Sequence, residues 1–266
     1  MSAVAILRRL AASAFLAGAL AASFLAAHAE IPLNERRSAY EDMSADNKAM
    51  QDDDTANPAM LSVLDGEALW QAKAGRAGKS CADCHGDAKD KMKGVAARYP
   101  AFDAAAGRPV NLEQRINLCR EGHQNATPFS FESKELLALT AYLGLQSRGE
   151  PIAPPDDPRL KPFIEQGRAL YDQRQGQLNL SCGQCHDDNR GKSLAGNKVP
   201  QAHPTGYPIY RLEWQSVGSL QRRLRNCMIG MRAEPYPFGA PEHVNMELYL
   251  MWRARGMKLE TPAVRP

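Results

Sequence analysis

Apolar and polar residues alternate at helical spacing in two stretches of the chain that resemble each other. The segment Gly66–Trp70 precedes Cys81 by the same interval by which the segment Gly167–Tyr171 precedes Cys182. Each segment has the periodicity of an amphipathic helix with an aromatic residue near its end. Self-similarity at a fixed spacing indicates that the chain contains two copies of one structural unit.

The similarity continues toward the end of each copy. A second predicted helix ends near a lone cysteine, with Leu112, Arg115, Ile116 and Cys119 in the first copy matching Leu220, Arg223, Leu224 and Cys227 in the second. A final apolar helix then contains Tyr142-Leu143 in one copy and Tyr249-Leu250 in the other. The predicted fold class is therefore all-α, with two tandem domains that arose by internal duplication.

The polar segments place the domain boundaries. Residues 30–58 are polar without sustained periodicity, so we expect an N-terminal arm that wraps a domain or a partner. The run Gly149–Pro158 is too rich in proline for a helix or a central strand. We accordingly expect one domain over residues 59–150 and a second over residues 151–266.

The first 29 residues have the pattern of an export signal. Arg8 and Arg9 precede an apolar run from Leu10 to Ala27, and Ala27-His28-Ala29 supplies the small residues that signal peptidase recognises. The alternative is a membrane anchor, since the run approaches the roughly 20 residues that span a bilayer. The Ala-rich run and its ending favour cleavage near Ala29, which predicts a periplasmic protein with no membrane span in its mature form.

The most specific chemical pattern is a pentapeptide that occurs once in each copy. Cys-x-x-Cys-His is formed by Cys81, Cys84 and His85, and again by Cys182, Cys185 and His186. In this pattern the two thiols bond the vinyl groups of a haem and the histidine becomes the proximal iron ligand. Zinc sites and thioredoxin-like redox pairs also use paired cysteines. Two identical contexts in an exported chain, without a βαβ pattern, favour two covalently bound haem c groups and a cytochrome c-like fold.

Composition and charge agree with two small haem domains. Aromatic residues make up 7% of the chain, while Gly occurs 20 times and Pro 18 times, so each half has few large side chains for a core. A buried haem would supply the missing apolar bulk. The 33 basic and 30 acidic residues nearly balance, and removal of Arg8 and Arg9 leaves a net charge of +1. Nothing in this balance indicates binding to nucleic acid.

Two cysteines, Cys119 and Cys227, are left over at equivalent places in the repeat. They could be buried structural thiols, partners in a disulfide, or an irrelevant pair. A further interpretation makes them distal haem ligands, and thiolate ligation would stabilise ferric iron and lower the reduction potential. The other candidate distal ligands are Met92, Met228, Met231, Met246, Met251, His123, His203 and His243. None of these methionines recurs at matching places in both halves.

The surroundings of Cys227 are basic. The nearby arginines are Arg222, Arg223, Arg225 and Arg232. Arg223 lies one helical turn before Cys227, where its guanidinium would favour the thiolate and could bind sulfate-like oxygens. A solvated basic helix face is the ordinary alternative. Arg115 has the same offset from Cys119, so position alone does not separate a functional arginine from a structural one.

From about Leu61 to the C-terminus, the chain resembles the SoxA family of dihaem cytochromes. The resemblance rests on both pentapeptides, both lone cysteines and the segment Arg223–Cys227. It implies axial ligation by His85 and Cys119 in one haem and by His186 and Cys227 in the other. It further implies that Cys227 is an active-site cysteine carried as a persulfide and that Arg223 binds thiosulfate. The first haem has no obvious catalytic part in this family.

The resemblance also implies a reaction and its partners. SoxA proteins are subunits of an L-cysteine S-thiosulfotransferase that oxidatively joins thiosulfate to a cysteine of the carrier SoxYZ. Electrons would leave through haem to the monohaem partner SoxX, in a heterodimer, and then to a soluble cytochrome c. Two alternatives stay open at this point: a thiosulfate dehydrogenase that releases tetrathionate, and a plain electron-transfer cytochrome.

Overall fold

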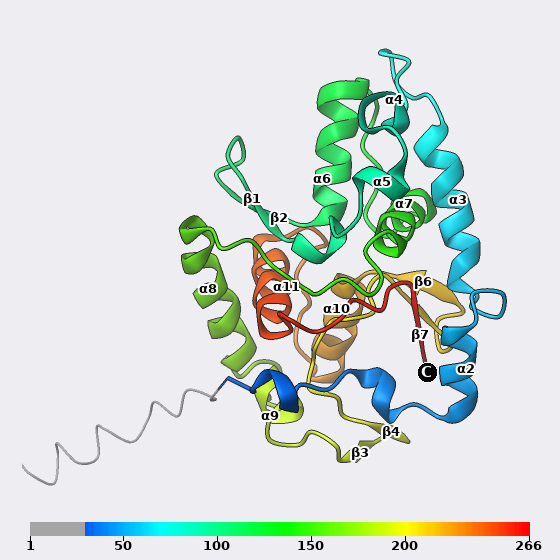
Figure 1. Cartoon of the computed structure of the whole chain (residues 1–266). Helices are drawn as coiled ribbons and strands as arrows, with labels where there is room; N and C mark the ends of the chain where they lie inside the picture. The colour runs from blue at the N-terminus through cyan, green and yellow to red at the C-terminus, as the bar shows by residue number, and fades with distance from the viewer. Residues whose placement is uncertain (1–29) are drawn as a thin grey trace, which may run out of the picture. The chain divides into compact units, whose positions relative to one another are not determined.

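The computed structural model of the chain describes residues 30–266, and the predicted signal peptide lies outside these residues. Residues Pro32–Pro266 form one compact unit (Figure 1). Within the described part of the chain, no helix combines the length and the apolar character that a membrane crossing requires.

The first half is built around a helix crossing. Its helices are α3 (Ala59–Gln71), α4 (Cys81–His85), α5 (Ala88–Lys91), α6 (Leu112–Cys119) and α7 (Lys134–Leu145). Helices α3 and α7 pack against each other (Figure 1). Their crossing point needs a glycine, because a Cβ at Gly66 would stand 2.1 Å from the Ala138 carbonyl oxygen. The repeated Gly66 and Gly167 of the sequence therefore mark close helix packing.

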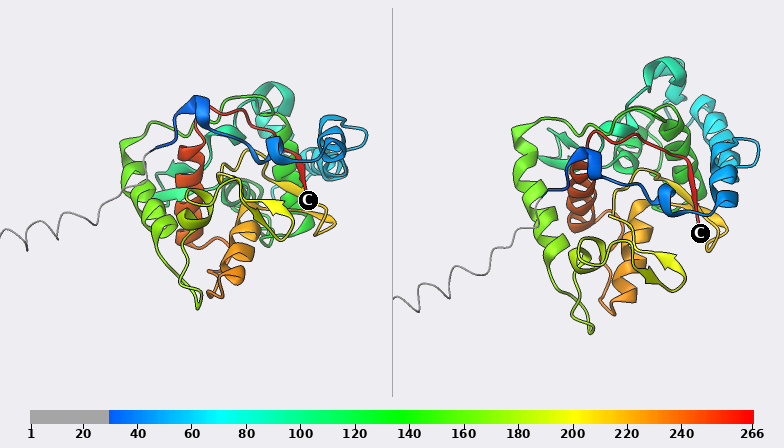
Figure 2. Two further views of the ribbon diagram at one scale, coloured as in Figure 1. Left: turned by 90° about the horizontal axis from the view of Figure 1, so that it is seen from below. Right: turned by 60° about the horizontal axis from the view of Figure 1, so that its bottom comes forward.

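The second half repeats this arrangement. Its helices are α8 (Lys161–Asp172), α9 (Cys182–His186), α10 (Leu220–Gly230) and α11 (Pro241–Arg253). Helix α8 packs against α11 in all three views (Figures 1 and 2). A Cβ at Gly167 would again stand 2.1 Å from a carbonyl oxygen, that of Asn245. The helices that the repeat predicted are thus present in both halves and cross in the same way.

Each helix crossing is filled by an aromatic pair at equivalent positions. Trp70 lies 6.2 Å from Tyr142 between ring centroids in the first half. Tyr171 and Tyr249 lie 5.4 Å apart, edge to face, in the second. The two pairs belong to separate apolar clusters, one per half. Buried apolar surface contributes roughly 25 cal/mol per Å², so burial of these rings stabilises each half.

The all-α prediction is corrected by short strands. The described residues contain the hairpins β1 (Ala101–Asp103) with β2 (Arg108–Val110) and β3 (Ser193–Leu194) with β4 (Asn197–Lys198), and the sheet of β5 (Ile209–Arg211), β6 (Ser216–Gly218) and β7 (Ala263–Arg265). Strand β5 pairs antiparallel with β6 and parallel with β7. Strands of two or three residues are too short for the alternation that identifies a strand in sequence. The fold is therefore helical with small sheets.

The N-terminal arm is more ordered than its composition predicted. It contains the 3-10 turns η1 (Leu33–Glu35) and η2 (Ala39–Asp42) and the helix α2 (Ala45–Asp52), whose first turn is capped by Ser44. Its backbone N–H at Arg37 donates to Gln201, and the Asn57 side chain donates to the Pro262 carbonyl. The arm therefore packs along the second half of the same chain, as Figure 2 shows.

The proline-rich segment between the halves is extended. It runs from the end of α7 to the 3-10 turn η5 (Pro158–Leu160), which leads directly into α8. The Gly149 N–H donates to Leu259 and the Ile152 N–H donates to Met257, so the segment is tied to the C-terminal chain. Two other irregular turns, η3 (Ala96–Arg98) and the π-helical η4 (Arg120–Gln124), lie in the first half.

Candidate functional site: two cysteine and histidine clusters

Both pentapeptides form short helices that begin with the same capping arrangement. In α4 the Ser80 hydroxyl accepts from the Asp83 N–H while Asp83 accepts from the Ser80 N–H. Ser181 and Gln184 make the same reciprocal pair in α9. Such a capping box satisfies backbone donors at the first turn of a helix. It fixes the turn on which the two cysteines and the histidine of each pentapeptide are placed.

The two pentapeptide histidines differ in their support. His186 Nδ1 lies 2.7 Å from the Pro200 carbonyl oxygen and must donate its proton there, which leaves Nε2 free to bind a metal. His85 makes no hydrogen bond to the described residues, and its ring stands 5.7 Å from that of Trp70. His85 is exposed, whereas His186 is half-buried. The second imidazole is therefore the better oriented ligand.

The lone cysteines lie beside the pentapeptides, as the distal-ligand interpretation requires. The Cys227 thiol lies close to the His186 side chain and to Cys182. Cys119 lies close to Cys81 and to the exposed Cys84. All six cysteines are free, so the disulfide alternative between the two lone cysteines is wrong.

The competing distal ligands have other positions. Met228, Met231, Met246 and Met251 are buried in the apolar interior, and Met92 packs against the apolar cluster of the first half. His203 and His243 each direct Nδ1 to a backbone carbonyl, and burial lowers the pKa of each to about 4. His123 is exposed on η4. Cys119 and Cys227 are the candidates that the fold brings to equivalent places in both halves.

The donor set of each cluster fits a covalently attached haem. Two free thiols on one helical turn, an adjacent imidazole and a further sulfur are the groups that hold c-type haem and complete its axial ligation. In the second cluster the imidazole of His186 and the sulfur of Cys227 lie close together. These residues would hold the haem and its iron.

The arginines beside the two distal cysteines have different partners. Arg115 forms an ion pair with Asp103 on β1 and lies close to Tyr99. Arg223 occupies the equivalent position on α10, but its side chain makes no ion pair or hydrogen bond with any residue that the structure describes. Position in the repeat does not distinguish the two arginines, but their partners do. Arg115 is neutralised by a carboxylate, and Arg223 is not.

The cause of this difference is one residue on the preceding hairpin. Cys119, Arg115, Asp103 and Tyr99 are related to Cys227, Arg223, Arg211 and Tyr207 by one constant offset along the sequence. Asp103 on β1 and Arg211 on β5 are therefore equivalent in the repeat. Where the first half places a carboxylate beside its arginine, the second half places another guanidinium.

Arg211 is held in position by its own hairpin. Its Nη2 atom lies 2.8 Å from Glu213, and its guanidinium carbon lies 5.2 Å from the centre of the Trp214 ring. Its Nε donor is buried and has no partner among the described residues. Burial lowers the pKa of Arg211 and the neighbouring Arg223 lowers it further, as expected for two cations in one site. An anion between them would satisfy donors that the described protein atoms leave free.

The pKa values of the two distal cysteines shift in opposite directions. Burial raises the pKa of Cys119, and Arg115 offsets this only in part. Burial also opposes ionisation of Cys227, but the hydrogen bond with His186 and the charges of Arg223 and Arg211 outweigh it and lower the pKa of this thiol. The second cluster therefore favours a thiolate, which is the nucleophilic form of cysteine.

Sequence reasoning missed Arg211 and Tyr207. Tyr207 lies near Arg223 and Cys227. Burial raises its pKa to about 12, although the positive charge of Arg223 lowers it. The signal was present in the sequence, because Tyr99-Pro100 and Tyr207-Pro208 repeat at the same spacing as the cysteines. The hairpins that carry Asp103 and Arg211 were too short to be recognised and aligned.

Comparison with known proteins agrees with this geometry. The model of the SoxA/TsdA cytochrome c domain matches residues 65–152 and again residues 166–259. The chain is thus a c-type cytochrome, a protein with covalently bound haem c. Within this class it belongs to the SoxA family.

Relatives and a solved structure show how far the similarity extends. The L-cysteine S-thiosulfotransferase subunit SoxA of Pseudaminobacter salicylatoxidans is 40% identical, over 88% of this chain and 82% of the relative. The same subunit of Rhodovulum sulfidophilum is 34% identical, over 90% and 83%. The crystal structure of SoxXA from P. pantotrophus has a TM-score of 0.83 at 30% identity and covers 87% of both chains.

Proposed function

We propose that this chain is the haem-carrying subunit of an L-cysteine S-thiosulfotransferase, which joins thiosulfate oxidatively to a cysteine of a carrier protein. The observation that carries the proposal is the cluster of Cys227 with two arginines, of which Arg223 is paired with no carboxylate of the described residues. The two relatives described above are named as subunits of this enzyme, and the chain matches them over most of their length. The pairing of Arg115 with Asp103 in the first half supports the assignment of the reaction to the second half.

Two haem groups are proposed, one in each half. Cys81 and Cys84 would attach the first haem, with His85 and Cys119 as its axial ligands. Cys182 and Cys185 would attach the second, with His186 and Cys227 as its axial ligands. A bound haem c supplies one-electron redox chemistry at each site. The protein holds the second imidazole through the Pro200 carbonyl, which fixes the tautomer that binds iron.

Binding of thiosulfate is assigned to Arg223 and Arg211. A guanidinium presents parallel N–H donors that match the oxygens of a sulfonate group. The free donors of Arg223 and the unpartnered Nε of Arg211 would bind these oxygens and direct the terminal sulfur toward Cys227. Exclusion of water around the half-buried cysteine would strengthen these contacts.

The proposed reaction consumes one thiol and releases two electrons and one proton. Its balance is carrier–SH + S₂O₃²⁻ → carrier–S–S–SO₃⁻ + H⁺ + 2 e⁻. Carried as a persulfide, Cys227 would bond the terminal sulfur of thiosulfate as two electrons leave: Cys–S–S⁻ + S₂O₃²⁻ → Cys–S–S–S–SO₃⁻ + 2 e⁻. The deprotonated carrier thiol would then take the S–SO₃⁻ group and release the Cys227 persulfide. The surroundings that lower the pKa of the Cys227 thiol would also favour the anionic persulfide as attacking and leaving group.

The proposed partners follow from the reaction and from the family. SoxX, a monohaem cytochrome, would form a heterodimer with this chain, and the similar structure from P. pantotrophus is that of a SoxXA protein. SoxYZ would be the carrier, and a soluble cytochrome c would accept the electrons. We place the mature protein in the periplasm, where the predicted export signal would deliver it.

Product analysis tests this function directly. The holoprotein with its partner is incubated with thiosulfate and oxidised cytochrome c, with and without the carrier, and the carrier mass and tetrathionate are measured. We expect carrier that is heavier by one thiosulfate and cytochrome reduction that depends on the carrier. Rapid tetrathionate formation without the carrier would instead establish a thiosulfate dehydrogenase. Absence of both products would leave a plain electron-transfer cytochrome.

A further inference from the structure

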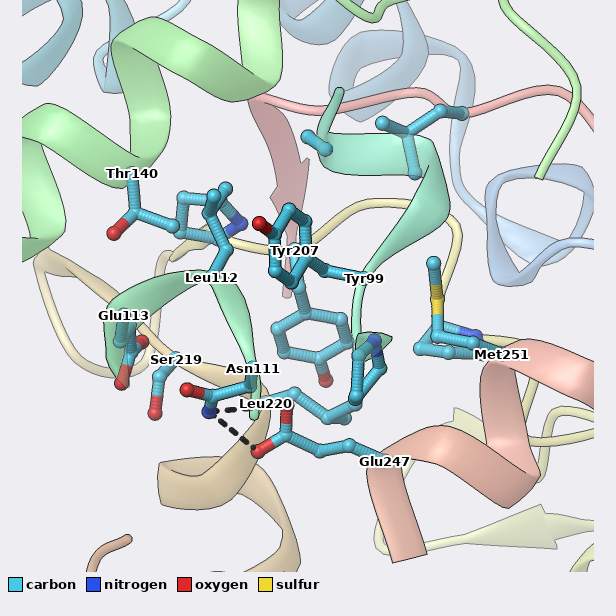
Figure 3. Close-up of a pocket in the computed structure, with 15 residues that line it drawn as sticks. Tyr99, Asn111, Leu112, Glu113, Thr140, Tyr207, Ser219, Leu220, Glu247 and Met251 are labelled. Atoms are coloured by element: carbon cyan, nitrogen blue, oxygen red, sulfur yellow. Dashed lines mark hydrogen bonds between the residues drawn. The ribbon is translucent and has the colours of Figure 1, made fainter. Parts of the chain in front are cut away.

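A pocket of about 80 Å³ lies where the two halves meet. Its lining includes Tyr99 with Tyr207, Pro100 with Pro208, Asn111 with Ser219, and Leu112 with Leu220, which are equivalent residues of the repeat (Figure 3). The two tyrosines also connect the pocket to the two distal cysteine sites. Tyr99 lies close to Arg115, while Tyr207 lies near Arg223 and Cys227. The pocket therefore lies between the two clusters.

Two glutamates of this pocket are almost fully buried. Glu247 on α11 is 8% exposed and accepts hydrogen bonds from Asn111, at 3.1 Å, and from Gln221, at 2.6 Å. Figure 3 shows the Asn111 amide directed at this carboxyl group. Glu113 on α6 is 5% exposed, and its Oε2 atom has no hydrogen-bond partner among the described residues. An unpartnered buried oxygen beside a pocket of this size is the setting in which proteins bind internal water.

The charges around the pair are mostly negative. Glu132 faces Glu113, accepts a hydrogen bond from the Ser219 N–H and lies 4.0 Å from Arg222. The other polar side chains that line the pocket are those of Tyr99, Thr140, Tyr207 and Ser219. Arg115, the nearest cation on α6, is engaged by Asp103. No cation in the described structure forms an ion pair with Glu113 or Glu247.

Desolvation therefore favours the protonated forms of both groups, and neighbouring carboxylates add to this at Glu113. Burial raises the pKa of Glu113 well above its usual range, and Glu247 and Glu132 raise it further. Burial raises the pKa of Glu247 to about 7, although Gln221 and Asn111 stabilise its ionised form. The surroundings of Glu113 thus favour its protonated form, while Glu247 can exchange a proton near neutral pH.

We propose that the pocket between the halves is an internal proton-binding site, in which Glu247, with water and the protonated Glu113, takes up the proton that thiosulfate conjugation releases. The step rests on the proposed function. The proton leaves the carrier thiol at the Cys227 site, and the two electrons of the same balance pass to two equivalents of ferric c-type haem. Tyr207 lies between that site and the pocket. Proton uptake by Glu247 keeps the interior electrically balanced while the electrons remain in the protein.

Redox-difference infrared spectroscopy of the haem-loaded full-length protein in complex with its partner tests the proposal. Chemical reduction and reoxidation near pH 7 need no thiosulfate. We expect a carbonyl-stretch signal of a carboxyl group that gains a proton on reduction, and this signal shifts in D₂O. It disappears in Glu247→Gln and changes position in Glu113→Gln. The matched control Glu135→Gln, at an exposed position of α7, leaves it unchanged.

Proton uptake measured with an indicator dye gives a second readout. Reduction of the unmodified complex near pH 7 takes up protons, and Glu247→Gln lowers this uptake by at least half. The visible spectrum of each variant shows that its haems are in place. A redox spectrum without any carboxyl signal, or the same signal and proton uptake in Glu247→Gln, would overturn the proposal.

The outcome is separable from that of the proposed function. A missing carboxyl signal in a complex that still conjugates thiosulfate to the carrier would refute the proton site alone. A carboxyl signal in a complex that forms no conjugate would refute the transferase function and its part in the proposal, while proton binding at Glu247 would stand.

Discussion

The two halves of the molecule place a tyrosine, an arginine and a cysteine at equivalent positions, but they surround the cysteine with different charges. In the first half Asp103 neutralises Arg115. In the second half Arg211 stands where the aspartate would be, so that two guanidinium groups face one thiol. Duplication supplied the same scaffold twice, and one position that carries a carboxylate in the first half and a guanidinium in the second separates a neutralised site from the proposed anion site.

The proximal sides of the two clusters differ as well. His186 is oriented by the Pro200 carbonyl and is half-buried, while His85 is exposed and has no hydrogen bond to the described residues. Asp187 and Arg253 form a buried ion pair next to His186, with the arginine over the Tyr171 ring. The repeat positions of this pair in the first half are the uncharged Gly86 and Gln146. The second half is thus more enclosed and more polar.

Removal of the distal cysteines should reveal the largest difference in activity between the two halves. Cys227→Ala should reduce carrier conjugation by at least about 10³-fold, because the covalent route is lost. Cys119→Ala changes only the neutralised site and should reduce it less than about threefold. Steady-state kinetics of both variants measures the difference. Equal losses would mean that the reaction is not confined to the second half.

Arg211→Asp makes the second half resemble the first. The new carboxylate would pair with Arg223, so two charge-assisted contacts to thiosulfate, worth about 1.5–3 kcal/mol each, are lost. We expect kcat/KM for thiosulfate to fall roughly 10³-fold. Arg211→Lys, which keeps the charge but not the parallel donors, should fall less. An unchanged kcat/KM in Arg211→Asp would exclude this arginine from the site.

Arg223→Gln tests one guanidinium without a reversal of charge. Loss of a single charge-assisted contact should lower kcat/KM roughly 10- to 100-fold, mainly through KM. The matched variant Arg115→Gln removes the paired arginine of the first half and should change kcat/KM less than about twofold. A larger effect of Arg115→Gln would show that position in the repeat, and not pairing, determines the role of these arginines.

A further expected effect concerns stability and pH. The pKa of Glu247 is about 7 in the folded chain and 4.5 in the reference state, so the folded protein binds more protons between these values. The contribution of Glu247 to stability should therefore fall as pH rises from about 4.5 to 7 and level off above, by a few kcal/mol in all. Chemical denaturation of the unmodified chain and of Glu247→Gln across this range measures it, because the difference between their free energies of unfolding should show this slope. A difference that does not change with pH would assign no titration to Glu247.

Much of this architecture could be predicted from the repeat. The helices that contain Gly66 and Gly167 and those that end near Cys119 and Cys227 follow from apolar periodicity and from the spacing to Cys-x-x-Cys-His. The free state of the two lone cysteines could not be predicted, since cysteine arithmetic alone permits a disulfide between them.

The parts that escaped prediction depend on long-range contacts. The pairing of β5 with β7 joins segments that are far apart in the sequence and leaves no local pattern. The partner of Arg115 is Asp103 on a short strand, and nothing in the sequence near Arg223 shows that its own partner position carries Arg211. The burial of Glu113 and Glu247 arises only when the two halves pack together.

The proposed function requires that thiosulfate chemistry occurs on the sulfur of Cys227 and not on that of Cys119. Peptide mass spectrometry of the holoprotein, quenched during turnover with thiosulfate, measures it most directly. We predict an added sulfur atom or a thiosulfate adduct on the Cys227 peptide and an unmodified Cys119 peptide. An adduct on Cys119, or turnover with both cysteines unmodified, would refute the assignment of the reaction to Cys227.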